Sequence, residues 1–188
     1  GTFAKYCDDD KNFIGTIISS DKDLLQLISD DIDIKLLKQK DYIRYNRETF
    51  FEDYGIEPIN IIDLKALMGD SSDNIPGCKG VGEKTAVQLL QQFGSIDGLL
   101  ANTDQLKGAL QRKIQEQVEE IRFSRFLATI KTDVPIEFDA QALVYQERNW
   151  ELLAPIYREL EFNSLLKQAP TALKQPAPKV GKKIKPQE

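Results

Sequence analysis

Alternating hydrophobic and polar positions predict a small α/β region in the first third of the chain. Residues 11–20, KNFIGTIISS, contain a β-branched apolar run that favours a buried strand. Residues 31–46 alternate apolar and polar side chains around a turn at 38–41, which predicts a β-hairpin. With one convincing core strand the predicted sheet is thin for a folded domain, so we expect further strands to precede Gly1.

Apolar spacing becomes mainly helical from residue 58 onward. Proline is common in the first turn of a helix, so Pro58 indicates the start of a helix that we predict over 59–68. Gly94 predicts the end of one helix, and Ser95 the N-cap of the next. The other expected elements are short helices over 24–29 and 83–93, one long amphipathic helix over 107–130, an extended segment over 132–138 and a last helix over 149–166 with Pro155 inside it.

Composition narrows the chemistry open to the chain. It has no histidine, which excludes Ser–His and Cys–His catalysis and a histidine zinc site. Cys7 and Cys78 are far apart and form no CxxC motif, so they indicate neither a zinc cage nor a disulfide framework. We expect reduced thiols in a cytoplasmic protein, and any hydrolysis would depend on carboxylates with bound metal ions. No apolar run is long enough for a membrane span.

The net charge of −5 is unevenly distributed. Residues 1–75 carry 9 basic and 16 acidic side chains, whereas residues 76–132 carry 8 basic and 6 acidic. The slight basic excess begins where a group of glycines begins. Because the local field matters more to a phosphate-bearing partner than the total charge, the acidic total does not exclude nucleic acid.

Two pairs of aspartates are the candidate chemistry of the chain. Asp21 and Asp23 follow the predicted strand, and side chains two residues apart on an extended segment share a face. They come at the carboxyl end of a strand, where open α/β sheets bind ligands. Asp70 and Asp73 are three residues apart, which on a helical turn also gives one face. Carboxylate oxygens at this spacing favour Mg²⁺ or Mn²⁺.

Each pair also has an ordinary structural interpretation. An aspartate before a helix is a common N-cap, which accounts for one member of the Asp21/Asp23 pair. The segment 70–74, DSSDN, is a good turn sequence. For the first pair the two interpretations stay open. Both pairs together favour a metal site, because four converging carboxylates without a cation would repel one another and take up protons.

The glycine-rich stretch after the second acid pair is the candidate anion-binding element. Residues 76–86, PGCKGVGEKTA, predict a short helix, a glycine hairpin and a second helix that starts at Glu83. Glycines let a phosphate approach the backbone amides closely, and a helix N-terminus attracts an anion. The spacing differs from that of a Walker loop. The candidate contact residues are Gly77, Lys79, Gly80, Gly82, Lys84 and Thr85.

These elements, in this order, resemble a known family. Residues 19–29, SSDKDLLQLIS, and residues 64–100, LKALMGDSSDNIPGCKGVGEKTAVQLLQQFGSIDGLL, are similar to the 5′-nuclease domain at the N-terminus of bacterial DNA polymerase I. That domain belongs to the flap-endonuclease superfamily. The similarity extends from Gly1 to about Leu166 and includes RFLATIKTDVPIEF and LEFNSLL.

The resemblance implies a fold and a division of the chain. The fold would be α/β: an incomplete PIN-like, flap-endonuclease-like sheet followed by a mainly helical helix–hairpin–helix (SAM-like) subdomain. Residues 1–68 would form the C-terminal part of the α/β nuclease core, and residues 69–167 the DNA-binding subdomain. Residues 168–188 contain four prolines and five lysines, which is typical of a linker; a flexible tether is favoured over a DNA-binding arm.

The resemblance also implies residue roles. Asp21, Asp23, Asp70 and Asp73 fall on positions that ligate the second part of a divalent-metal cluster and would be catalytic. The stretch from Gly77 to Thr85 falls on the hairpin that grips duplex DNA, where family members often also hold a monovalent cation such as K⁺. Cys78 stands where a small aliphatic residue is usual, a departure that should leave the hairpin intact.

The implied function is 5′-3′ exonuclease or flap endonuclease activity on duplex or flap DNA, in the cytoplasm at the bacterial nucleoid. Family members carry further metal-binding acids and a clamp for the 5′ end in an N-terminal half. We therefore expect a fragment, inactive alone, that works with the remainder of the nuclease domain and polymerase chain. The alternative is a non-catalytic DNA-structure-binding module whose aspartates are caps and turns. A metal-binding protein unrelated to DNA is disfavoured by the hairpin.

Overall fold

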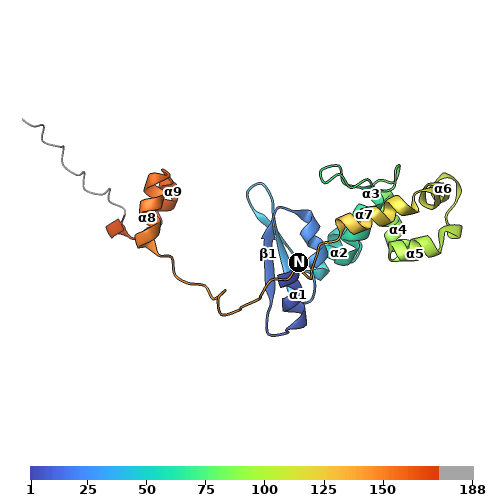
Figure 1. The fold of residues 1–188 in the computed structure, drawn as a ribbon. Helices are drawn as coiled ribbons and strands as arrows, with labels where there is room; N and C mark the ends of the chain where they lie inside the picture. The colour runs from blue at the N-terminus through green and yellow to red at the C-terminus, as the bar shows by residue number, and fades with distance from the viewer. Residues whose placement is uncertain (174–188) are drawn as a thin grey trace, which may run out of the picture. The chain divides into compact units, whose positions relative to one another are not determined.

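A computed structural model describes residues 1–173 of the 188. The chain divides into two compact units, Gly1–Phe138 and Asp139–Glu188 (Figure 1). The elements of the first unit are α1 (Thr2–Asp9), β1 (Gly15–Ser19), η1 (Lys22–Leu27), β2 (Ile32–Leu37), β3 (Tyr42–Tyr45), α2 (Arg47–Tyr54), η2 (Pro58–Asn60), α3 (Ile61–Met68), α4 (Glu83–Phe93), α5 (Ile96–Ala101), η3 (Thr103–Gln105), α6 (Gly108–Glu116) and α7 (Val118–Ala128), where η marks a 3₁₀ helix. The second unit contains α8 (Trp150–Glu159), α9 (Asn163–Leu166) and η4 (Thr171–Leu173).

The sheet has three strands in the order β1-β2-β3. The predicted hairpin is confirmed: β2 and β3 are antiparallel, and Lys38 N donates to Asp41 O at 2.7 Å across the turn. β1 runs parallel to β2, with Gly15 opposite Ile32, and η1 forms the crossover between them. The sequence pattern did not predict this parallel pair, nor the helix α1 that precedes it.

The predicted helix ends are confirmed in the helical part. Gly94, whose φ is positive at 76°, ends α4, and the Ser95 side chain accepts a hydrogen bond from Gly98 N at the start of α5. Pro58 opens the short η2, which leads into α3. These signals act within one turn of chain, which is why sequence alone reveals them.

Two predicted helices are interrupted, and these predictions are corrected. The expected long helix over 107–130 is two helices, α6 and α7, which meet at Gln117 with φ of −118° and ψ of 26°. The expected helix over 149–166 is divided into α8 and α9 around Glu161, whose φ is 55°. Pro155 does lie inside α8, as predicted.

One hydrophobic core connects the sheet to the helices of the first unit. It includes Leu25, Ile34 and Phe50 near the sheet, and Leu67 and Ile121 on α3 and α7, all of them fully buried. α3 packs against η1, α4 and α7, and the last two lie beside it in Figure 1. The residues at the end of α3 are therefore held from several directions, and this is where the candidate site lies.

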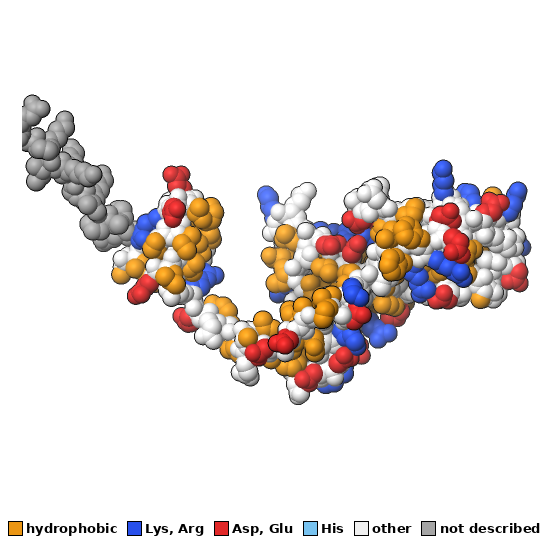
Figure 2. Space-filling view, in the orientation of Figure 1, with side chains coloured by type: hydrophobic (Ala, Val, Ile, Leu, Met, Phe, Trp, Pro, Cys, Tyr) orange, Lys and Arg blue, Asp and Glu red, His pale blue; other side chains and the backbone are white. Residues whose placement is uncertain are grey.

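The outward face of α7 carries exposed hydrophobic side chains. Phe123, Phe126 and Leu127 are three and four residues apart on this helix and are 54%, 75% and 43% exposed. Figure 2 shows hydrophobic side chains gathered over this helix. On another face of α7, Arg125 forms an ion pair with α3: its Nε lies 2.9 Å from Oδ1 of the buried Asp63.

No helix within residues 1–173 is long and apolar enough to cross a membrane. Of the predicted linker over 168–188, residues 171–173 form η4, and residues 174–188 lie outside the described part. The predicted boundaries at residues 68 and 167 remain a prediction.

Candidate metal centre and hairpin

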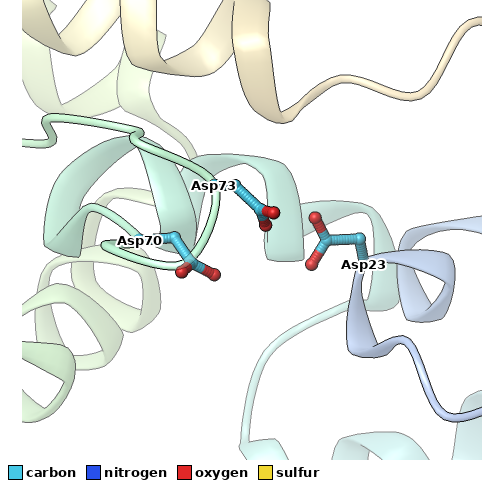
Figure 3. A group of neighbouring side chains, drawn as sticks. All are labelled: Asp23, Asp70 and Asp73. Atoms are coloured by element: carbon cyan, nitrogen blue, oxygen red, sulfur yellow. The ribbon is translucent and has the colours of Figure 1, made fainter.

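Three aspartates from segments far apart in the sequence converge in the structure. Asp23 lies in the first turn of η1, and Asp70 and Asp73 lie in the loop after α3. One carboxylate oxygen from each lies within 4.8 Å of the others, and the three side chains point toward a common centre (Figure 3). We call Asp23, Asp70 and Asp73 the acid cluster.

Lys65, on α3, contacts all three members of the acid cluster. Its Nζ is 2.7 Å from Asp70 Oδ2 and 3.6 Å from Asp73 Oδ2, and it also pairs with Asp23. Burial alone would lower the pKa of Lys65, but its hydrogen bonds to Asp23 and Asp70 outweigh burial and raise the pKa. The lysine is therefore charged, and it balances part of the negative charge of the cluster.

Asp70 is fixed by both its side chain and its backbone. Hydrogen bonds from Lys65 and then from Ser72 hold the pKa of Asp70 well below its usual range. Its N–H and C=O pair with Ile75 at 2.9 and 2.8 Å, which closes the loop 70–75. The expectation that Asp70 and Asp73 share a helical turn is therefore wrong. The closed loop brings them together, because its bridge turns the chain back on itself.

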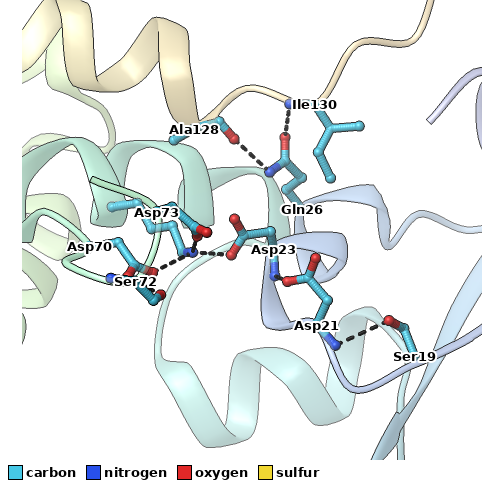
Figure 4. Close-up of polar contacts among 10 residues, drawn as sticks. Ser19, Asp21, Asp23, Gln26, Asp70, Ser72, Asp73, Ala128 and Ile130 are labelled. Atoms are coloured by element: carbon cyan, nitrogen blue, oxygen red, sulfur yellow. Dashed lines mark hydrogen bonds and ion pairs between the residues drawn. The ribbon is translucent and has the colours of Figure 1, made fainter. Parts of the chain in front are cut away.

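Asp21 has a different place from the acid cluster. It is the N-cap of η1, and its Oδ1 accepts a hydrogen bond from Asp23 N at 2.9 Å (Figure 4). The expected extended pair is corrected accordingly: Asp23 already lies in the 3₁₀ turn, where the chain rotates it away from Asp21. Asp21 does line the same open cavity of about 370 Å³ as the acid cluster and Lys65.

A buried glutamine joins η1 to the end of α7. Gln26 is 5% exposed; its Nε2 donates to Ala128 O at 3.0 Å, and its Oε1 accepts from Ile130 N at 2.9 Å (Figure 4). Both ends of its amide are satisfied, so the contact has one favoured geometry. Gln26 thereby sets the position of Asp23, three residues earlier on the same 3₁₀ helix.

The glycine hairpin, residues 77–85, is attached to the end of α3, beside the acid cluster, by backbone contacts; the short helix predicted at its start is not formed, because residues 76–82 are not helical. Cys78 N donates to Leu67 O at 2.8 Å, which connects the hairpin to the last turn of α3. Gly77 has φ of 66°, and a Cβ atom on it would lie 2.2 Å from Gly69 N. Only glycine permits both this conformation and this close approach.

The other predicted contact residues of the hairpin differ in exposure. Gly80, with φ of 86°, and Gly82 are exposed, and nothing lies within 4 Å of a Cβ placed on Gly82. Lys79 and Lys84 are exposed, and Thr85 is half-buried in the first turn of α4. The N-terminus of α4 is therefore open to an anion at Gly82, and two lysines lie near it in sequence.

Three residues at this site were not found from the sequence. Lys65 lies in an amphipathic-looking helix segment, Gln26 looks like an ordinary polar position, and Gln117 looks like part of a continuous helix. Each contacts a segment remote in sequence: Lys65 pairs with Asp23, Gln26 binds Ala128 O, and Gln117 Oε1 accepts from Lys79 N. A lysine five residues before an acid pair was the one available signal, and it is a weak one because most lysines on helices simply face solvent.

The donor set suits a hard divalent cation. Three carboxylates offer oxygen ligands, and the ammonium group of Lys65 shows that their centre already attracts positive charge. Asp21 and Ser72 line the same cavity and add oxygen atoms nearby. The residues present therefore fit a divalent cation of this kind in chemistry.

The fold and the site define an α/β protein with a carboxylate cluster that suits a metal ion, next to a glycine-rich hairpin. Residues 56–151 match the family model described as 5′-3′ exonuclease, C-terminal SAM fold. The chain belongs to this family, which confirms the resemblance seen in the sequence.

The chain is similar to curated bacterial proteins. It is 44% identical over 171 residues to DNA polymerase I of Bacillus subtilis, a match that covers 89% of this chain and 19% of that protein. It is 46% identical over 123 residues to a 5′-3′ exonuclease of the same organism, covering 64% of this chain and 42% of the relative. The chain thus spans about a fifth of the polymerase and less than half of the exonuclease.

Among solved structures, the chain is similar to the bacteriophage T5 flap endonuclease in a pseudo-enzyme-product complex with DNA and metal ions. The TM-score is 0.55 at 23% identity, and the match covers 67% of this chain and 47% of that one. At this identity the likeness establishes the fold, and it confirms the predicted α/β sheet with a SAM-like helical part.

Proposed function

We propose that this chain is part of the 5′-3′ exonuclease domain of a bacterial DNA polymerase I, where it holds duplex or flap DNA and supplies part of the metal site. The observation that carries the proposal is the direct attachment of the hairpin to the acid cluster. Cys78 N and Gly77 are packed on the last turn of α3, next to Asp70. A phosphate held by the hairpin would therefore lie at a fixed place relative to the cluster.

The acid cluster would take Mg²⁺ or Mn²⁺, with Asp23, Asp70 and Asp73 as ligands and Asp21 as a further member on the cavity wall. Bound metal supplies Lewis-acid stabilisation and an activated water in phosphodiester hydrolysis. The hairpin residues orient the duplex by phosphate contacts, which position the backbone without reading bases. Support for metal and DNA comes from the T5 relative, whose structure holds both. A K⁺ ion at the hairpin rests on the family resemblance alone.

The proposed setting is the bacterial cytoplasm at the nucleoid, with the rest of the nuclease domain and the polymerase as partners in one longer chain. The curated DNA polymerase I of Bacillus subtilis supports the longer chain, since it is about five times as long as the matched part. The alternative of a non-catalytic DNA-binding module keeps the hairpin and assigns the aspartates to caps and turns; Asp21 fills such a role.

Binding and cleavage of a 5′-flap duplex test the proposal. Residues 1–188 should bind the flap in Mg²⁺ without appreciable cleavage, because one ligand set cannot hold the two ions that this chemistry uses. Joined to the preceding half of a related exonuclease, the chain should support cleavage that Asp70→Asn or Asp73→Asn abolishes. The proposal is wrong if the unaltered chain binds no duplex, or if cleavage by the joined protein survives both substitutions.

A further inference from the structure

The junction between α6 and α7 is broken where the sequence favours a continuous helix. Residues 108–128 contain glutamine, glutamate, arginine and lysine in abundance and no internal glycine or proline after Gly108. Gln117 nevertheless leaves the helical conformation, with φ of −118° and ψ of 26°. A break without a local cause indicates that a contact elsewhere compensates for the lost helical hydrogen bonds.

That contact is with the hairpin. The Gln117 side-chain Oε1 accepts from Lys79 N at 2.7 Å, and its Nε2 donates to Lys79 O at 3.4 Å. The same Nε2 also donates to Lys113 O at 3.2 Å, which satisfies a carbonyl at the end of α6. One amide thus binds both backbone groups of Lys79, as a neighbouring strand would.

Four consecutive hairpin residues, 77–80, make hydrogen bonds to residues of α6, of α7 and of the junction between them. Gly77 N donates to the fully buried Ser124 Oγ at 2.9 Å, and Cys78 Sγ donates to Lys113 O at 3.7 Å. Beyond Lys79, Gly80 O accepts from Lys113 Nζ at 3.3 Å. The hairpin backbone is therefore shaped by the helix pair, and it is not held by its own turn alone.

We infer that Gln117 is a positioning residue for duplex binding, which acts through Lys79 to fix the direction of the hairpin amides. The inference rests on the proposed function. Gln117 is half-buried and both polar atoms of its amide are engaged with Lys79 and Lys113, whereas Lys79 and Gly80 are exposed. It therefore contributes no phosphate contact of its own. Among the described hydrogen bonds, its amide is the one side-chain group that binds both backbone groups of an exposed hairpin residue.

A purely structural role for Gln117 predicts a different outcome. If the amide served only to cap α6 through Lys113 O, its loss would lower the stability of the whole unit and leave the hairpin's relation to DNA unchanged. If it orients the hairpin, its loss releases Lys79 locally and weakens DNA binding with little change in global stability. Local amide exchange, global stability and the salt dependence of binding separate these two roles.

The test variant is Gln117→Met, which keeps side-chain length and removes the hydrogen bonds of the amide to Lys79 and to Lys113 O. The matched control is Gln115→Met, which changes an exposed glutamine near the end of α6 whose Nε2 donates to Thr103 Oγ1 at 3.2 Å. We expect Lys79 amide exchange to accelerate roughly fivefold to tenfold in Gln117→Met, and duplex affinity to fall by a similar factor. The slope of log affinity against log salt should stay unchanged, because no charged phosphate contact is lost.

Gln117→Asn keeps an amide at this position and shortens it by one methylene, so it should reproduce both effects if Gln117→Met folds poorly. The inference is overturned if either variant accelerates Lys79 exchange and duplex affinity stays at the level of Gln115→Met. It is also overturned if Lys79 exchange does not change in a folded variant. Failure of the unaltered chain to bind duplex would instead overturn the proposed function, and Lys79 exchange would still report whether Gln117 controls the hairpin.

Discussion

Gly69 and Gly77 pack backbone against backbone at the joint between the acid cluster and the hairpin. A Cβ atom on Gly77 would lie 2.2 Å from Gly69 N and 2.5 Å from Gly69 Cα, and a Cβ atom on Gly69 would lie 2.8 Å from Pro76 O. Both glycines have positive φ. The cluster and the hairpin are therefore set in place by backbone contact, which leaves less room for adjustment than a side-chain contact would.

Gly77→Ala should destabilise the chain strongly. The added methyl group meets the Gly69 backbone, and alanine is strained at φ of 66°, so we expect a loss of at least about 1–3 kcal/mol in the free energy of unfolding. Urea denaturation measures this loss. Gly82→Ala is the control: with φ of −98° and open space around its Cβ, it should change stability by less than about 1 kcal/mol. Equal losses in the two variants would contradict the backbone joint.

Local signals account for the part of the fold that the sequence predicted. Gly94, Ser95 and Pro58 act on their own turn of chain, and alternation in residues 31–46 specifies both strands of the hairpin. The glycine stretch before Glu83 was identified for the same reason, because positive φ at Gly77 and Gly80 is a local requirement.

The remainder depends on contacts between distant segments. The parallel pairing of β1 with β2 is set by tertiary packing. The helix break at Gln117 is accompanied by hydrogen bonds between its side chain and the distant Lys79. The sequence predicted the members of the acid cluster but not their local conformation. Spacing pointed to Asp23, Asp70 and Asp73, yet the expected extended pair at Asp21/Asp23 and the expected helical turn at Asp70/Asp73 were wrong. Lys65 was missed because a lysine on a helix carries no sign of what it faces.

The two cysteines should differ in reactivity, and both should react slowly at neutral pH. Burial, and then the charge of Asp8, raises the pKa of Cys7; burial also raises the pKa of Cys78. A raised thiol pKa leaves less thiolate at a given pH, so alkylation by iodoacetamide should be slower than for free cysteine and should accelerate as pH rises. Half-buried Cys7 should react first, and Cys78 only on unfolding. Mass spectrometry of the alkylated chain decides the order; faster labelling of Cys78 would show that the hairpin opens.

Lys84→Ala should weaken duplex binding equally for all sequences. Lys84 is exposed in the first turn of α4, beside the open N-terminus at Gly82, where it can reach a phosphate. Loss of one phosphate contact should lower the slope of log affinity against log salt by about 0.9. A binding titration at several salt concentrations measures this slope. Lys40→Ala, an exposed lysine in the turn between β2 and β3, should leave it unchanged. Sequence-dependent losses, or the same loss in both variants, would argue against a hairpin grip.

Lys65 and a divalent cation should compete for the acid cluster. The Lys65 ammonium group contacts Asp23, Asp70 and Asp73, so a cation must bind against its charge. In Lys65→Met the three carboxylates lose this partner, and the free energy of unfolding without metal should fall by about 1–3 kcal/mol.

Mn²⁺ should then restore more stability to Lys65→Met than to the unaltered chain, because binding to the folded state stabilises it in proportion to affinity. The rise in melting temperature during a Mn²⁺ titration, started from the chelated protein, measures the effect. Lys22→Met is the matched control, since Lys22 is exposed, lines the same cavity and has no ion pair among those described. If Mn²⁺ raises the melting temperature of both variants equally, Lys65 does not occupy the cation position, and the acid cluster binds metal elsewhere or not at all.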